Sequence, residues 1–141
     1  MLLNISYNDL KQKKQIEDIV GKPFSLQSRW KMGGIGSGKL VIKSSSIEIH
    51  NLLILDNNIN ICSIELRPMG IIVRFRSLLE TYGLVIPYFK LKLYKGKSRI
   101  YSIYKDQYYI KVEAEKSSVH KFFNKISSQK ILNTPPSLED M

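Results

Sequence analysis

The chain has 141 residues, of which 43% are hydrophobic and 24% are charged, so it is long enough for one domain with its own core and its composition excludes wholesale disorder. Lysine and arginine number 22 against 12 acidic residues, and this formal net charge of +10 favours nucleic acid, anionic membranes or acidic proteins as partners. Most of the cations are lysines, which also serve simply to keep a surface soluble.

Residues 6–20 are predicted to form a short polar helix. Ser6 is a suitable N-cap, and Gly21 followed by Pro23 would end the helix. The apolar stripe of this helix is thin, so we expect loose docking and treat residues 1–25 as an N-terminal helix and linker.

From about residue 26 apolar and polar residues alternate, as in half-buried antiparallel strands. The alternating runs are KLVIK, SIEIH, ICSIEL, IIVRFR, FKLKLY and YYIKVE, with inward positions at Leu40, Ile42, Ile47, Ile49, Cys62, Ile64, Leu66, Ile71, Val73, Phe75, Phe89, Leu91, Leu93, Tyr108, Ile110 and Val112. Turn-forming residues separate these runs at 44–46, 56–58, 68–70, 95–97 and 105–107. We predict a mainly β, α+β domain at residues 26–132, an antiparallel meander of about seven strands that forms a barrel or a strongly bent sheet.

The period changes back to that of a helix at residues 117–132. Val119, Phe122, Phe123 and Ile126 share one face, which we expect to pack against the sheet. The following residues, 133–141, are proline-containing and acidic, which predicts a flexible tail.

The sequence GGIGSGKL at residues 33–40 resembles a phosphate-binding loop, but Leu40 stands where that motif needs serine or threonine. A strand pattern follows Lys39, whereas a phosphate-binding loop opens a helix. We therefore predict a glycine-rich turn without nucleotide binding.

No catalytic or metal-binding constellation is predicted, and no cofactor. His50 and His120 lack neighbours at ligand spacing, Cys62 falls on an apolar strand face, and Glu113 with Glu115 forms an ordinary solvated pair. The N-terminus lacks the features of a signal peptide and no apolar run is long enough to span a bilayer, so we expect a cytoplasmic protein.

The strongest candidate site is a basic hairpin at residues 90–99, KLKLYKGKSR. Its cations are candidates for contact with phosphate or another anion: Lys90, Lys92, Lys95, Lys97 and Arg99. Tyr94, Tyr101, Tyr104 and Tyr109 lie nearby in the sequence, and aromatic side chains between cations suit nucleic acid or an anionic membrane. The alternative is that these lysines only protect an edge strand from aggregation.

The order of a strand meander followed by one amphipathic helix resembles the pleckstrin-homology superfamily, especially its GRAM-like and bacterial members. The resemblance covers residues 36–131 and rests on GKLVI and SIEIH at the start and YYIKVEAEKSSVHKFFNKI at the end. Two features depart from that family: Phe122 and Phe123 stand in the closing helix where a tryptophan is usual, and the first hairpin offers only Lys39 and Lys43 for phosphoinositides.

The resemblance implies a non-enzymatic binding module whose partner is a protein or a membrane surface. The alternative is a nucleic-acid-binding protein that uses the basic hairpin, and a small-ligand-binding barrel or enzyme is a more distant one.

Overall fold

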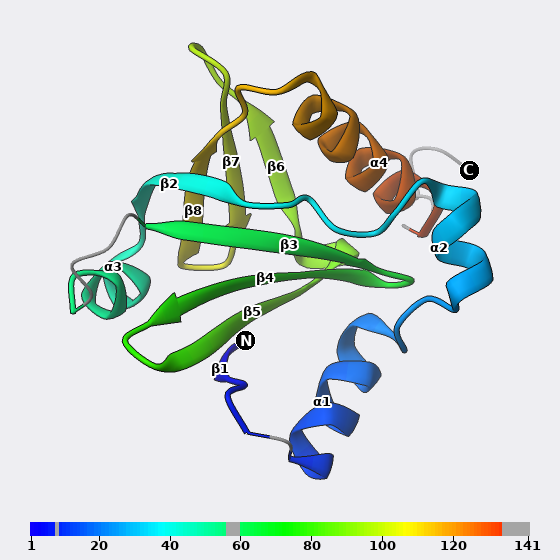
Figure 1. Ribbon diagram of the computed structural model, residues 1–141, viewed down its shortest axis with the longest axis horizontal. Coiled ribbons are helices and arrows are strands. Elements are labelled where there is room, and N and C mark those ends of the chain that lie inside the picture. The colour runs from blue at the N-terminus through cyan, green and yellow to red at the C-terminus, as the bar shows by residue number, and fades with distance from the viewer. Residues whose placement is uncertain (8, 56–59, 134–141) are drawn as a thin grey trace.

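The computed structural model describes residues 1–7, 9–55 and 60–133, and within these ranges the chain is α+β with eight strands and four α-helices (Figure 1). The strands are β1 (Leu2–Asn4), β2 (Leu40–Ser45), β3 (Ile61–Arg67), β4 (Gly70–Ser77), β5 (Glu80–Pro87), β6 (Lys92–Lys95), β7 (Ile100–Lys105) and β8 (Tyr108–Glu113). The helices are α1 (Leu10–Val20), α2 (Leu26–Met32), α3 (Ile47–Leu53), α4 (Ser117–Asn133) and the 3-10 helix η1 (Tyr88–Lys90).

All eight strands belong to one antiparallel sheet in the order β1-β5-β4-β3-β2-β8-β7-β6. The predicted meander is therefore present, but the predicted closure into a barrel is not, because β1 and β6 form two separate edges of the described sheet. Pro87 ends β5, and η1 then redirects the chain so that β6 pairs with β7 alone. Helix α4 packs against η1, where β5 and β6 separate.

The core lies on the inner face of the bent sheet. The predicted inward residues of β3 and β4 are all buried, as are Leu40 and Ile42 of β2 and Ile110 and Val112 of β8. Phe89 is an exception, with 72% of its surface exposed, because it lies in η1 rather than in a strand.

Helix α4 closes this core with the predicted aromatic face. Val119, Phe122, Phe123 and Ile126 are all buried, whereas Ile131 is exposed. The ring of Phe123 stacks on Tyr101 of β7 with centroids 4.0 Å apart, and the hydroxyl of Tyr101 hydrogen-bonds Nδ1 of His120 at 3.0 Å.

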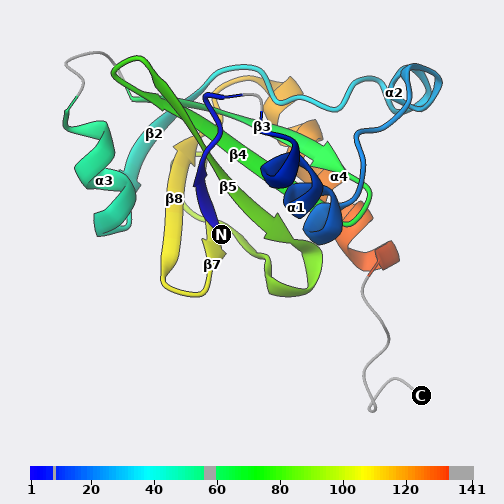
Figure 2. The same cartoon turned by 90° about the horizontal axis from the view of Figure 1, so that it is seen from below.

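Helix α1 lies on the outer face of the sheet, opposite α4 (Figure 2). Val20 is fully buried against Ile72 and Val85, so the helix docks at its C-terminal end while Leu10 stays exposed. Gly70 permits this approach, since a Cβ there would lie 2.6 Å from Val20 and 2.2 Å from the carbonyl oxygen of Ile86. Asp9, rather than Ser6, is the N-cap of α1.

One segment predicted as strand is helical, and one further helix was not predicted. SIEIH begins α3, where Ile49 and Leu53 are buried four residues apart and Ile47 is exposed, so the helical period prevails over the alternation. Residues 26–32 form α2 because Ser25 accepts a hydrogen bond from the Ser28 amide and Gly33 ends the helix in the left-handed conformation. The predicted turn at 56–58 and residues 134–141 of the predicted tail lie outside the described residues.

Candidate functional site

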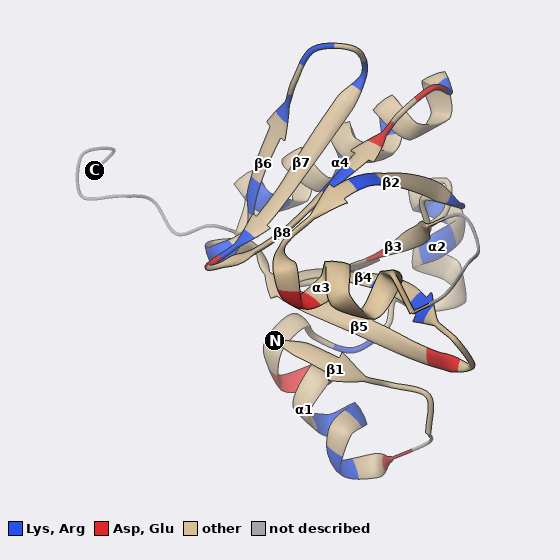
Figure 3. Ribbon diagram, turned by 90° about the vertical axis from the view of Figure 1, so that its left-hand side faces the viewer, with Lys and Arg blue, Asp and Glu red and all other residues tan. Residues whose placement is uncertain are grey.

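The predicted basic hairpin is formed by β6 and β7, and its tip projects beyond the rest of the sheet (Figure 3). Gly96 begins the turn, and Ser98 and Arg99 follow with φ of 57° and 61°. Strand β6 is an edge of the sheet, so the hairpin is open to a partner on one side.

The structure does not gather the five predicted cations into one cluster. Lys92 lies on the outer face of β6 in register with Tyr104, whereas Lys95 lies on the opposite face. Lys90 faces the Asp106 carboxylate at 3.8 Å, Lys97 is exposed at the tip, and Arg99 donates to the Glu115 carbonyl at 3.3 Å.

Three of the nearby tyrosines do lie together. Tyr94, Tyr104 and Tyr109 form a row across the outer face of β6, β7 and β8, while Tyr101 points inward to Phe123. Lys111 Nζ lies 5.9 Å from the centre of the Tyr109 ring. We call Lys92, Tyr94, Tyr104, Tyr109 and Lys111 the tyrosine face.

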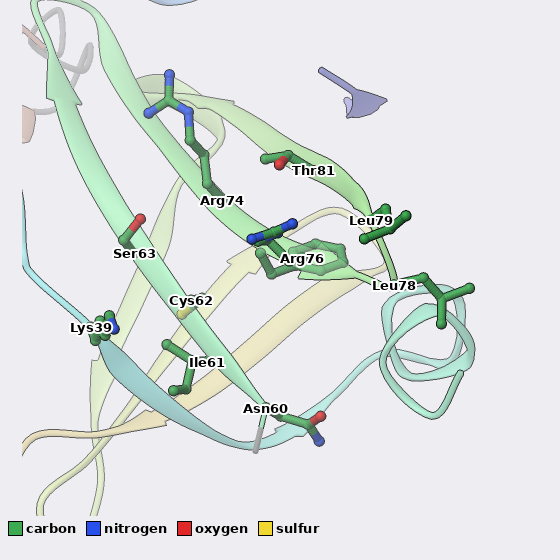
Figure 4. A pocket seen from close by; sticks show the side chains of 11 residues that line it. Lys39, Asn60, Ile61, Cys62, Ser63, Arg74, Arg76, Leu78, Leu79 and Thr81 are labelled. Carbon is green, nitrogen blue, oxygen red and sulfur yellow. The ribbon is translucent and has the colours of Figure 1, made fainter. Parts of the chain in front are cut away.

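A second basic region lies elsewhere, on the outer face of β2 to β5. Residues from these strands and their connections line a groove of about 740 Å³, which we call the arginine groove (Figure 4). Its lining residues are Lys39, Asn60, Ile61, Cys62, Ser63, Arg74, Phe75, Arg76, Leu78, Leu79 and Thr81. The lining therefore contains three cations, two hydroxyl groups and an amide, with no carboxylate among its residues.

The charge of the arginine groove is only partly compensated. Arg74 donates to Glu65 at 2.5 Å, but Glu65 also accepts from Arg67 at 2.5 Å, so one carboxylate serves two guanidinium groups. Burial raises the pKa of Glu65, yet the hydrogen bond from Arg67 and the charge of Arg74 outweigh it and hold that pKa below its usual value. No carboxylate of the described residues forms an ion pair with Lys39 or Arg76.

The rim of the arginine groove is apolar. Leu78 and Leu79 form the turn between β4 and β5, with 57% and 88% of their surfaces exposed, and Figure 4 shows them pointing outward. Leu78 has φ of 57°, a conformation that costs a leucine about 1 kcal/mol or more. We call this pair the leucine tip. Ser77, just before it, donates to the carbonyl of Leu52, which brings α3 beside the tip.

The other residues singled out in the sequence have structural roles or none. Burial raises the pKa of Cys62 to about 12, so its thiol is held in the unreactive protonated form. His50 lies on α3 and His120 is bonded to Tyr101. Within the described part of the chain, no three His, Cys, Asp or Glu side chains are grouped to hold a metal, and no helix is long and apolar enough to cross a membrane.

The glycine-rich loop at residues 33–39 connects α2 to the strand β2, not to a helix. Gly33, Gly34 and Gly38 have positive φ, and Gly36 forms a bridge with Glu65. The predicted turn is thus limited to the end of α2, because residues 35–37 run beside β3, where the Leu66 amide donates to the Ile35 carbonyl and the Ser37 amide to the Ile64 carbonyl. The segment then leads to Lys39, which lines the arginine groove.

Sequence reasoning missed this groove. Two signals in the sequence pointed to it. In IIVRFR the alternation places Arg74 and Arg76 on one strand face. Two leucines in a turn are also unusual, because turns favour Gly, Asn and Asp. Their meeting with Lys39, from a connection more than thirty residues earlier, depends on the pairing of β2, β3 and β4.

Comparison of the chain with models of known protein families, with curated proteins and with solved structures finds no match.

Proposed function

We propose that this protein is a non-enzymatic binding module that docks on an anionic membrane surface through the leucine tip and the arginine groove. The observation that carries the proposal is the position of two exposed leucines directly beside a groove lined by three cations and no carboxylate among its residues. Apolar insertion and attraction to anionic lipid are the two contributions that bind peripheral proteins to membranes.

Apolar insertion and electrostatic attraction are each large enough to support membrane binding. Moving an exposed leucine out of water yields about 1.5–3 kcal/mol when burial is complete. Each lysine or arginine near an anionic leaflet contributes about 1 kcal/mol. Lys39 and Arg76 have no ion pair to break within the described chain, so we expect both to contribute fully.

The strand order supports a scaffold similar to the pleckstrin-homology superfamily. Strands β2 to β5 and strands β6 to β8 form two meanders that are joined by the pairing of β2 with β8, and α4 packs against η1 between β5 and β6. On this proposal the membrane-facing end is formed by the β4–β5 turn and the end of α3, where Ile54 and Leu55 are also exposed.

Sedimentation with lipid vesicles tests the proposal. We expect the protein to bind phosphatidylcholine vesicles that contain phosphatidylserine, and to bind pure phosphatidylcholine much more weakly. The double variant Leu78→Ser/Leu79→Ser and the variant Arg76→Glu should each reduce binding by about tenfold or more, from loss of apolar insertion and of phosphate contact respectively.

Helix α1 offers matched controls at residues that do not line the arginine groove. Leu10→Ser removes a leucine that is 76% exposed, and Lys13→Glu changes the net charge as Arg76→Glu does. Both controls should bind vesicles like the unaltered protein. Absence of binding to either vesicle, or equal losses in the control variants, would reject membrane docking and favour a protein partner.

A further inference from the structure

The tyrosine face has a geometry that membrane docking does not use. Tyr104 and Tyr109 are direct partners across β7 and β8, with ring centroids 5.8 Å apart. Tyr94 on β6 meets Tyr104 edge-to-face at 5.6 Å. The three rings thus form a continuous aromatic strip across three adjacent strands.

This strip is on the outside of the protein. On the same strands, Ile103, Ile110 and Val112 point to the opposite face and are fully buried in the core. Tyr94 is 57% exposed. Its ring therefore exposes apolar surface to water, and packing in the core does not explain this exposure.

Cations flank the strip. Lys92 is in register with Tyr104 and Lys111 lies over Tyr109, and neither forms an ion pair with a carboxylate of the described residues. A hollow of about 540 Å³ adjoins the strip at the β6 edge. Its lining consists of Phe89, Lys90, Lys92, Tyr94, Tyr104 and Asp106, and Phe89 is 72% exposed.

We propose that the tyrosine face binds single-stranded nucleic acid, with bases stacked on Tyr94 and Tyr104 and phosphates held by Lys92 and Lys111. Every base has a face that stacks on an aromatic ring, so such a strip binds without a sequence requirement. A duplex already stacks its bases on one another and offers only its backbone, so the strip favours single strands over duplex.

The same observations disfavour a membrane at this position. The tip of the β6–β7 hairpin reads Lys-Gly-Lys-Ser-Arg and has no apolar side chain to insert. Insertion needs a projecting apolar group, whereas the three tyrosine rings contact one another across the strands and each carries a polar hydroxyl. The tyrosine face and the leucine tip are thus separate surfaces, and this inference does not rest on the membrane proposal.

Fluorescence anisotropy with labelled oligothymidylate, oligouridylate and a duplex of equal length tests the inference. We expect both single strands to bind more tightly than the duplex. Tyr94→Ala should weaken binding about tenfold, as loss of one stacked base does. Tyr94→Phe keeps the ring and should restore the affinity.

Paired charge variants then separate this face from general basicity. Lys92→Glu/Lys111→Glu should weaken binding and reduce the slope of log affinity against log salt by about 0.7 for each lost phosphate contact. Lys95→Glu/Lys97→Glu has the same net charge but alters the hairpin tip and the other face of β6, so its effect should be much smaller.

Three results would overturn the inference: no binding at low salt, equal binding of duplex and single strand, or an affinity that Tyr94→Ala leaves unchanged. A circular-dichroism melting curve of each variant separates loss of binding from loss of the fold. Vesicle binding by the same variants should be unaltered, so failure here and failure of the membrane proposal give different results.

Discussion

The hairpins β4–β5 and β6–β7 both end in exposed turns, and the two turns have opposite chemistry. The first presents Leu78 and Leu79, and the second presents a run of basic and small polar residues from Lys95 to Arg99. Both contain non-glycine residues with positive φ, among them Leu78 and Ser98, each at 57°. Figure 1 shows the two turns pointing in different directions from the sheet.

The difference shows that the density of cations along a sequence does not predict where their side chains converge. The β6–β7 hairpin has more cations, but strand alternation divides them between two faces. The β4–β5 hairpin has fewer, yet Arg74 and Arg76 share a face with Lys39 around one groove. What distinguishes the two regions is whether charges converge on a concave surface beside apolar groups.

The β6–β7 hairpin packs on α4 through its inner face, and a substitution at Phe123 removes this packing most directly. This side chain is 1% exposed and stacks on Tyr101, so Phe123→Ala should lower the free energy of unfolding by about 3–5 kcal/mol. Phe89→Ala removes an exposed ring of the same size and should change it by less than about 0.5 kcal/mol. Urea denaturation measures both, and equal effects would contradict the assignment of α4 to the core.

The positive charge of the arginine groove can be raised by removing the Glu65 carboxylate, which Arg67 and Arg74 share. Glu65→Gln removes the negative charge and one of the two oxygens that accept from Arg67 and Arg74, so it should cost about 1–2 kcal/mol of stability at pH 7. Because it also releases Arg74, it should strengthen binding to anionic vesicles.

The same carboxylate predicts a pH dependence. Its pKa in the folded protein lies below the usual 4.5, so its stabilisation is present above pH 4.5 and is lost as the pH falls through the folded pKa. Denaturation of the unaltered protein and of Glu65→Gln across this range measures the contribution. The two stability curves should converge at low pH, and parallel curves would mean that Glu65 is not stabilised by its arginines.

The smallest effects concern the strained turns. Leu78→Gly and Ser98→Gly each remove the strain of a left-handed conformation. Glycine also loses more conformational entropy on folding, which offsets part of this gain, so we expect each variant to raise the free energy of unfolding by about 0.5 kcal/mol. Only Leu78→Gly should weaken vesicle binding. Equal losses of vesicle binding in both variants would remove the functional distinction between the two turns.

The repeated alternation in β3, β4 and β8 and the helical face of α4 were readable because each follows from a local period with a single buried face. The helical state of SIEIH was not readable, because Ile47 and Ile49 fit a strand while Ile49 and Leu53 fit a helix. The packing of α3 beside β4 decides between the two. The open sheet could not be predicted either, since closure depends on the path of the chain through η1.

The sequence by itself determined the α+β class, most of the inner-face core and the positive charge, because these depend on residue type and on periods of two or of 3.6 residues. Tertiary structure alone decided which cations act together. Arg74 and Arg76 join Lys39 only through strand pairing, and Tyr94 joins Tyr109 only across β7. A site assembled from several strands is set by their register, and register results from the packing of the whole sheet rather than from any one segment.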